Sequence, residues 1–177
     1  MKRTVIPGRF QPFHLGHLHA VKWLLNRCDE LIIAVCSAQK SHTLENPFTA
    51  GERILMIRET LRKEGVDPWR IMIAPVQDIE YNSIWVCYLE SILPPFDSAA
   101  SRNPLVIRLF KERGYSILQP PLTRREEYSG VRIRRMMLEG DDDWKKLVPE
   151  PVVEVIEHIG GVERLRELAK TDEVIRG

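Results

Sequence analysis

Short apolar runs alternate with amphipathic helical patterns along most of the chain. The run at residues 31–36 is continuously apolar, which is typical of a strand buried on both faces of a parallel sheet. Just before it, Leu18, Val21 and Leu24 recur at helical spacing. Because a strand, a helix and a second strand in this order favour a right-handed crossover, the strands are expected to pair in parallel. The pattern predicts an α/β fold, a doubly wound, Rossmann-like parallel sheet with helices on both faces.

Apolar periodicity and turn residues set the expected bounds of the elements. The predicted strands are 4–7, 31–36, 71–74, 98–101 and 115–118. The predicted helices are 16–27, 50–64, 83–93, 105–113, 129–138, 151–159 and 162–170. Thr49 and Glu52 are spaced as a capping box, and the apolar stripe of the helix they start is predicted at Ile54, Ile57 and Leu61. We expect residues 1–145 to form the sheet domain and residues 146–177 a small C-terminal helical extension packed on it.

Composition excludes several classes of partner. Lys and Arg number 26 and Asp and Glu 25, so the net charge of +1 provides no general attraction for nucleic acid or an anionic membrane. No apolar run approaches the roughly 20 residues that cross a bilayer. Cys28, Cys36 and Cys87 form an odd set without a CxxC pair, which predicts thiols in a reducing compartment. We therefore expect a cytoplasmic protein that binds small molecules, with no nucleic-acid or membrane partner.

The segment from Gly8 to His17 joins the first predicted strand to a helix. Ligands of open α/β sheets bind beyond the carboxyl ends of the strands. Gly8 permits a tight turn, Arg9 can donate two N–H bonds to a phosphate, and Gly16 leaves the helix N–H groups open to an anion. His14 and His17 fall on one side of the helix start. The combination predicts a phosphate-binding site.

Simpler explanations exist for the individual residues of this segment. Gly8 alone would suit an ordinary turn, and His19 is expected to be a surface residue. A zinc site made of His14, His17 and His19 lacks a further carboxylate or cysteine at suitable spacing, so no metal ligand is predicted. The phosphate site is predicted from the conjunction of strand, Gly-Arg, HxGH and helix.

The string GRFQPFHLGH resembles the archaeal-type nicotinamide-nucleotide adenylyltransferases, within the nucleotidyltransferase superfamily that carries an HxGH motif after its first strand. The resemblance covers essentially the whole chain. The other matching segments are SAQKSH at 37–42, NPFTAGER at 46–53, PVQDI at 75–79 with Asn82 and Trp85, and YSGVRIR at 128–134.

This resemblance implies an enzyme in which the phosphate of nicotinamide mononucleotide (NMN) attacks the α-phosphorus of ATP, giving NAD and pyrophosphate. It also implies Mg²⁺ bound to the ATP phosphates and a homo-oligomer, often a hexamer. The implied catalytic residues are His14 and His17 on the ATP phosphates, Arg9 on the NMN phosphate, and Arg134, which clamps the ATP phosphates from the other side. The residues implied to bind ATP or NMN are Gly8, Phe10, Gln11, Phe13, Gly16, Ser37, Gln39, Ser41, His42, Asp78, Ile79, Asn82, Trp85, Ser101, Asn103, Tyr128 and Ser129.

Three positions depart from the family pattern. Val131 stands where relatives usually carry Thr, Arg102 where they often carry Gly, and Glu45 lies in a loop that is often basic. Two implied roles have structural alternatives, since Trp85 stacks on the nicotinamide ring or is a core aromatic, and Ser129 binds phosphate or is a plain N-cap.

Two other functions remain open. One is a related nucleotidyltransferase with another phosphate acceptor, such as FMN. The other is a non-catalytic sensor that binds NAD in the same site, for which Val131 is the only hint in the sequence.

Overall fold

The computed structural model describes residues 1–124 and 126–176, with side chains as far as residue 170. Five parallel strands form one sheet in the order β3-β2-β1-β4-β5. The strands are β1 (Arg3–Gly8), β2 (Glu30–Val35), β3 (Ile71–Pro75), β4 (Ser98–Ala100) and β5 (Ser116–Leu118). The helices are α1 (Leu15–Leu25), α2 (Ala50–Lys63), α3 (Trp85–Ile92), α4 (Pro104–Glu112), α5 (Gly130–Glu139), α6 (Glu150–His158) and α7 (Gly161–Arg176). Short 3₁₀ turns are η1 (Pro68–Arg70), η2 (Asn82–Ile84) and η3 (Asp142–Leu147).

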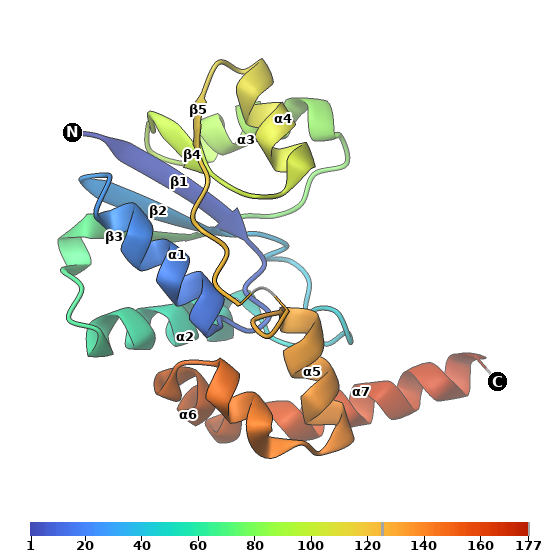
Figure 1. Cartoon of the computed structure of the whole chain (residues 1–177). Helices are drawn as coiled ribbons and strands as arrows, with labels where there is room; N and C mark the ends of the chain where they lie inside the picture. Colours follow the sequence, from blue (N-terminus) through green and yellow to red (C-terminus); the bar gives the residue numbers. More distant parts are fainter. Residues whose placement is uncertain (125, 177) are drawn as a thin grey trace.

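Helices cover both faces of the sheet (Figure 1). Successive side chains of a strand point to opposite faces, so each strand supplies both cores. On β2, Ile33 packs in the core that α1, α2 and α5 complete, whereas Ile32 packs in the core that α3 and α4 complete. The continuous apolar run of residues 31–35 in β2 reflects this double burial. The parallel sheet with helices on both faces confirms the predicted doubly wound fold.

Most predicted elements form within a few residues of their expected bounds. The helix predicted at 83–93 begins with the 3₁₀ turn η2, and neither Tyr81 nor Ile84 provides a side-chain cap that would start an α-helix earlier. The capping box of Thr49 and Glu52 is confirmed, because each side chain accepts a hydrogen bond from the other residue's backbone N–H.

The prediction for the buried face of α2 is wrong in part. Its fully buried residues include Met56 and Ile57, but Ile54 is only partly buried and Arg53 takes the place expected for an apolar residue. A guanidinium is buried at this position because four backbone carbonyls of the neighbouring loops accept its hydrogen bonds.

The C-terminal helices pack on the sheet domain through the same core as α1 and α2. Val152, Ile156 and Leu165 are buried there, and Arg164 donates to both carboxylate oxygens of Glu52 at 2.8 Å. We propose that the boundary between the sheet domain and the C-terminal helical extension lies after residue 145. No helix within 1–124 or 126–176 has the length and apolar character needed to span a bilayer.

Candidate active site

The site begins at the turn between β1 and α1. His14 is the N-cap residue of α1, and its Nδ1 accepts a hydrogen bond from the backbone N–H of His17 at 3.3 Å. In return, Nδ1 of His17 accepts from the backbone N–H of His14 at 3.2 Å. The two rings stack with their centroids 3.5 Å apart and an angle of 18° between planes. The HxGH spacing thus forms a capping box made of two imidazoles, in which each ring holds the other in place.

This geometry fixes the protonation of both rings. A nitrogen that accepts an N–H bond carries a lone pair, so Nδ1 of His14 and of His17 is unprotonated and the neutral rings carry their proton on Nε2. Burial lowers the pKa of His14 from 6.5 to about 4. Burial, and then the neighbouring His14, hold the pKa of His17 well below 6.5. Near neutral pH each ring therefore has one free donor, its Nε2–H.

Aromatic side chains and a glycine support the histidine pair. The ring of Phe10 lies edge-on to His17 with centroids 4.9 Å apart, and Phe13 stacks on the same ring at 5.6 Å. Both phenylalanines are buried in the core. At Gly16, a Cβ atom would lie 3.1 Å from Nδ1 of His14 and 3.0 Å from Cβ of Tyr128, so the close packing of the His14 ring depends on the absence of a side chain there.

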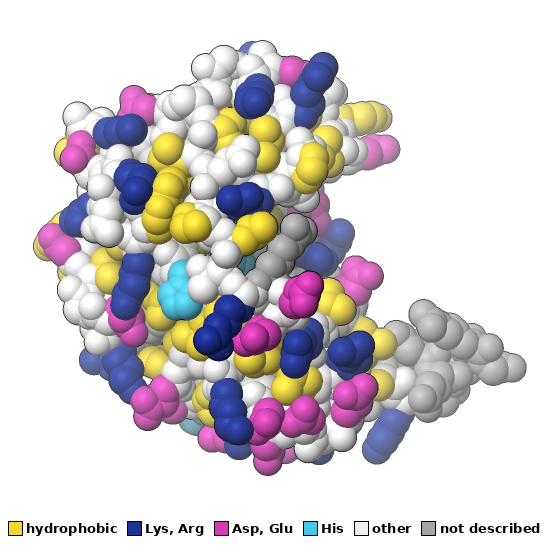
Figure 2. Space-filling model, in the orientation of Figure 1, with side chains coloured by type: hydrophobic (Ala, Val, Ile, Leu, Met, Phe, Trp, Pro, Cys, Tyr) yellow, Lys and Arg dark blue, Asp and Glu magenta, His cyan; other side chains and the backbone are white. Residues whose placement is uncertain are grey.

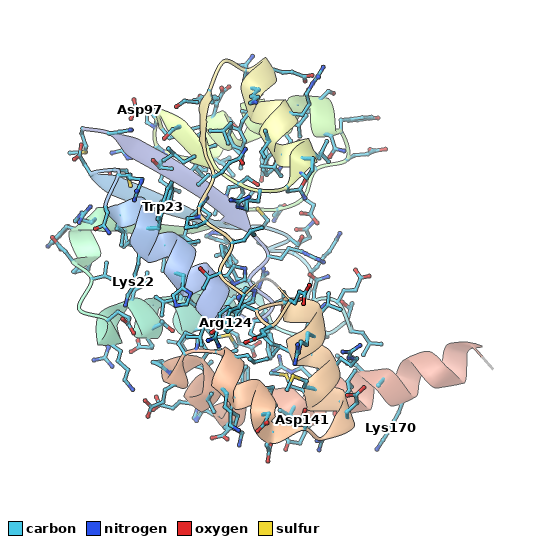
Figure 3. The ribbon with its side chains drawn as sticks, in the orientation of Figure 1. Lys22, Trp23, Asp97, Arg124, Asp141 and Lys170 are labelled. Carbon is cyan, nitrogen blue, oxygen red and sulfur yellow. The ribbon has the colours of Figure 1, made fainter. Side chains whose placement is uncertain are left out.

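A cavity of about 340 Å³ lies at the carboxyl ends of β1 and β4. The segment of residues 119–123, which we call the strap, follows β5 and forms one wall of the cavity. The strap belongs to the connection from β5 to α5 that Figure 1 shows. Arg124, which is labelled in Figure 3, lies in the same connection. Both histidines line the cavity, and Arg102 is the only charged residue among its lining residues. The lining residues are Ile6, Pro7, His14, Gly16, His17, Ala20, Ala100, Ser101, Arg102, Pro120, Pro121, Leu122, Thr123 and Tyr128.

Two buried polar side chains, those of Arg53 and Gln11, join the loop after β1 to the loop after β2. Neither role was predicted from the sequence. Arg53 is fully buried, and its Nη1 donates to the carbonyls of Arg9 and Cys36, both at 2.7 Å. Gln11, predicted to bind a nucleotide, uses its amide on the backbone of Phe48, donating to O at 2.8 Å and accepting from N at 3.1 Å. The one signal in the sequence for the role of Arg53 was the position of an arginine on the apolar face of a predicted helix.

Arg134 brings α5 against the same loops. It is 8% exposed, and it donates from Nη1 to Gln11 O at 2.6 Å and from Nε to Leu44 O at 3.0 Å. Its Nη2 has no hydrogen-bond partner within the described residues and is available for a ligand. Burial, and then the nearby positive charge of Arg9, lower the pKa of Arg134. Arg9 is half exposed, with Glu45 4.0 Å away.

Ser129 occupies the N-cap position of α5 without making a side-chain cap bond. The plain N-cap alternative therefore does not account for this serine, and its hydroxyl can serve a ligand. Tyr128, next to it, lines the cavity.

Asp78 connects the loops that follow β2 and β3. Its Oδ1 accepts from the N–H and hydroxyl of Ser37 at 3.2 and 3.0 Å, its backbone exchanges two bonds with the amide of Gln39, and Lys40 Nζ lies 2.9 Å from Oδ2. Partial burial opposes the charge, but the bonds from Lys40 and Ser37 lower the pKa of this carboxyl. Asp78 thus holds two loops together.

The residues predicted for the nicotinamide side do not line the cavity. Trp85 packs edge-on against Phe110 with centroids 5.7 Å apart, on the α3–α4 side of the sheet, so it is at least partly a core aromatic. Asn82 lies in η2, next to α3.

Several other predicted residues also lie outside the cavity. Ser41 and His42 bond one another at 2.9 Å on the surface. Asn103 caps α4 by accepting from two backbone N–H groups, and Gly8 ends β1 beneath the ring of Phe10. Ile79 lies in the loop after β3.

The low pKa of His14 makes stability depend on pH. The unfolded chain binds this proton near pH 6.5 and the folded chain only near pH 4. Stability is therefore fully present above pH 6.5 and declines as the pH falls towards 4, by at most about 3 kcal/mol from this residue. Urea unfolding of the native chain and of His14→Asn between pH 7 and 4.5 should show a shallower decline in the variant. Equal slopes would show that His14 is not held neutral.

No group of three or more His, Cys, Asp and Glu side chains that could hold a metal ion occurs within the part of the chain that the structure describes. The cavity itself is lined by no carboxylate. The cavity lining therefore provides no cage of protein oxygens for Mg²⁺. It suits a Mg²⁺ ion that arrives on the phosphates of a nucleotide and keeps its water ligands.

Comparison with known sequences identifies the family. A family profile described as "Cytidylyltransferase-like" matches residues 5–136. The nicotinamide-nucleotide adenylyltransferase of Ignicoccus hospitalis is 52% identical over 170 residues, covering 96% of this chain and 99% of the relative. That of Saccharolobus solfataricus is 52% identical over 172 residues, covering 97% and 99%.

Solved structures share the fold. A bifunctional NMN adenylyltransferase/ADP ribose pyrophosphatase from Francisella tularensis, complexed with AMP and a manganese ion, superposes with a TM-score of 0.74 at 21% identity, covering 99% of this chain and 54% of that one. This chain thus spans about half of that bifunctional chain. A nicotinic acid mononucleotide adenylyltransferase from Plasmodium falciparum gives a TM-score of 0.66 at 13% identity, covering 92% and 97%. With these folds and the close sequence relatives taken together, the chain belongs to the archaeal-type nicotinamide-nucleotide adenylyltransferases, within the cytidylyltransferase-like nucleotidyltransferases.

Proposed function

We propose that the chain joins ATP and NMN to form NAD and pyrophosphate. The observation that carries the proposal is the stacked pair of neutral histidines, whose Nε2–H groups are available as donors in a cavity lined by no carboxylate. Such a site accommodates a polyanion and stabilises charge that develops on a phosphoryl group. The named relatives carry out adenylyl transfer to a nicotinamide nucleotide, which agrees with this chemistry.

The reaction proceeds by direct transfer in this proposal. An oxygen of the NMN phosphate forms a bond to the α-phosphorus of ATP while the bond from that phosphorus to the bridging oxygen breaks, and pyrophosphate leaves. The attacking phosphate is already ionised near pH 7, so no general base is needed. The protein aligns two polyanions and neutralises the transferring group.

The residues divide this work by position. His14 and His17 donate from Nε2 to oxygens of the ATP phosphates. Arg134 adds its Nη2 from α5, with the hydroxyl of Ser129 beside it, and Arg9 pairs with the NMN phosphate. Mg²⁺ enters with ATP as part of the substrate and offsets the triphosphate charge.

The nicotinamide end of NMN is assigned to the loop after β3. Asp78 keeps that loop against the Ser37–Gln39 segment, and Asn82 and the exposed part of Trp85 follow it. A cationic pyridinium ring over an indole is favourable by about 0.5–2 kcal/mol. A cytoplasmic location and a homo-oligomer remain part of the proposal. In Figure 2, basic and acidic side chains are interspersed over the face shown, as suits a protein of net charge +1 that binds small ligands.

A substrate comparison tests the function. The protein is incubated with ATP, Mg²⁺ and either NMN, its nicotinic acid analogue or FMN, and the dinucleotide product is quantified. We expect NAD from NMN, with kcat/KM at least about tenfold above that for FMN. Higher turnover with FMN would favour the related transferase, whereas tight NAD binding without turnover under varied metals and temperatures would identify a sensor.

A glycine at the start of α5 provides a test of the loop geometry. A Cβ at Gly130 would lie 2.9 Å from the carbonyl oxygen of Gln11 and 3.1 Å from Nη1 of Arg134, and the backbone atom cannot yield without moving the loop. Gly130→Ala should therefore lower kcat by about tenfold or more, although alanine is the better helix former. Gly51→Ala is the matched control, since a Cβ in the first turn of α2 meets nothing closer than 4.0 Å. Equal kcat in the two variants would contradict the assigned geometry.

A further inference from the structure

Arg102 stands out among the cavity residues that the proposed reaction does not use. It follows β4 and is the only charged residue in the lining. Its Nε donates to the carbonyl oxygen of Pro120 in the strap at 2.5 Å. A side chain on the loop after β4 thus reaches across the cavity edge to the segment after β5.

The strap has little else to hold it. Pro120 and Pro121 lack a backbone N–H. The bond from Arg102 is the only hydrogen bond that residues 120–123 make within the described part of the chain. The position of this wall therefore depends on Arg102 and on apolar contacts.

The rest of the guanidinium remains available. Neither Nη1 nor Nη2 of Arg102 has a hydrogen-bond partner among the described residues. Apolar side chains make up part of the cavity lining. Ile6 comes from β1 and Ala20 from α1, and Pro121 and Leu122 belong to the strap. An apolar slot with a planar cation at its edge suits a flat aromatic ring, because a guanidinium stacks on such a ring or bonds its nitrogen and oxygen acceptors.

We infer that Arg102 binds and covers the nucleobase of ATP, holding the strap against the base and favouring a purine over the smaller pyrimidine ring. The inference rests on the proposed function, since it takes this cavity as the ATP half of the site. His14 and His17, which line the same cavity, then bind the ATP phosphates.

The test compares the native protein with Arg102→Ala and Arg102→Lys by calorimetric titration with ATP and CTP and by steady-state NAD formation. We expect Arg102→Ala to raise the Kd and KM for ATP about tenfold, with the KM for NMN and kcat at saturation changed less than about twofold. The ratio of Kd for CTP to Kd for ATP should fall towards one. Lysine keeps the charge and N–H donors but not the planar face, so its values should be intermediate.

The control is Arg108→Ala. Arg108 lies on the exposed surface of α4, forms an ion pair with Glu112 and does not line the cavity. It should match the native protein in both assays. An unchanged Kd for ATP in Arg102→Ala, or parallel losses in ATP affinity, NMN affinity and thermal stability, would overturn the inference. If the native protein binds ATP but forms no NAD, the proposed function fails, and the role of Arg102 is still decided by the ATP and CTP titrations.

Discussion

Replacing His14 by asparagine should lower kcat for NAD formation by about 10²–10³-fold while leaving the fold intact. The asparagine carbonyl can occupy the place of Nδ1, accept the backbone N–H of His17 and cap α1, because asparagine is among the best N-cap residues. It has no counterpart of Nε2–H. The variant therefore separates the two functions of the imidazole, which are to start the helix and to bond phosphate.

Two further variants control this experiment. His14→Ala removes the cap as well and should lower the free energy of unfolding by about 1 kcal/mol more than His14→Asn. His19→Asn changes an exposed histidine on the same helix and should leave kcat unchanged. If His14→Asn kept native kcat, the histidine would serve only as a cap and the phosphate role would be wrong.

Loss of the Arg134 guanidinium should have an effect of similar size. Arg134→Met removes the charge and leaves the carbonyls of Gln11 and Leu44 without their donors, so kcat should fall at least about 10²-fold and stability by about 2–3 kcal/mol. Arg134→Lys restores a charge but not the fork that reaches both carbonyls and the phosphate together, so it should recover only part of the rate. Steady-state kinetics and thermal unfolding measure the two effects.

The adjacent residue provides the control. Arg135 is largely exposed and lies 3.9 Å from Glu139 on the same helix. Arg135→Ala should therefore leave kcat and KM unchanged. Native kcat in Arg134→Lys, or a large loss in Arg135→Ala, would contradict the assignment of Arg134.

Local periodicity was sufficient to predict the sheet and its helices. Residues 31–35 of β2 are buried on both faces, so this strand is apolar without interruption. The capping box at Thr49 marks the start of α2. The HxGH spacing also predicted a phosphate site after β1. The mutual bonding of His14 and His17 was not predicted, because it depends on ring orientations that spacing alone does not determine.

Long-range polar contacts account for what the sequence did not reveal. Gln11 and Arg53 use their side chains on backbone groups 37 and 44 residues away, and local pattern gives no means of finding such partners. The strap carries no recognisable motif, so its part in the cavity became clear only from the arrangement of β4 and β5.

The stereochemical course at the α-phosphorus tests the central claim most directly. The claim is that the NMN phosphate attacks ATP itself, with the histidines and arginines as donors and no protein group as nucleophile. One diastereomer of adenosine 5′-O-(1-thiotriphosphate) is used in place of ATP, and the configuration of the thio-NAD product is determined by phosphorus NMR. A single in-line displacement predicts inversion, whereas retention would require two displacements through a covalent adenylyl-enzyme and would contradict the account.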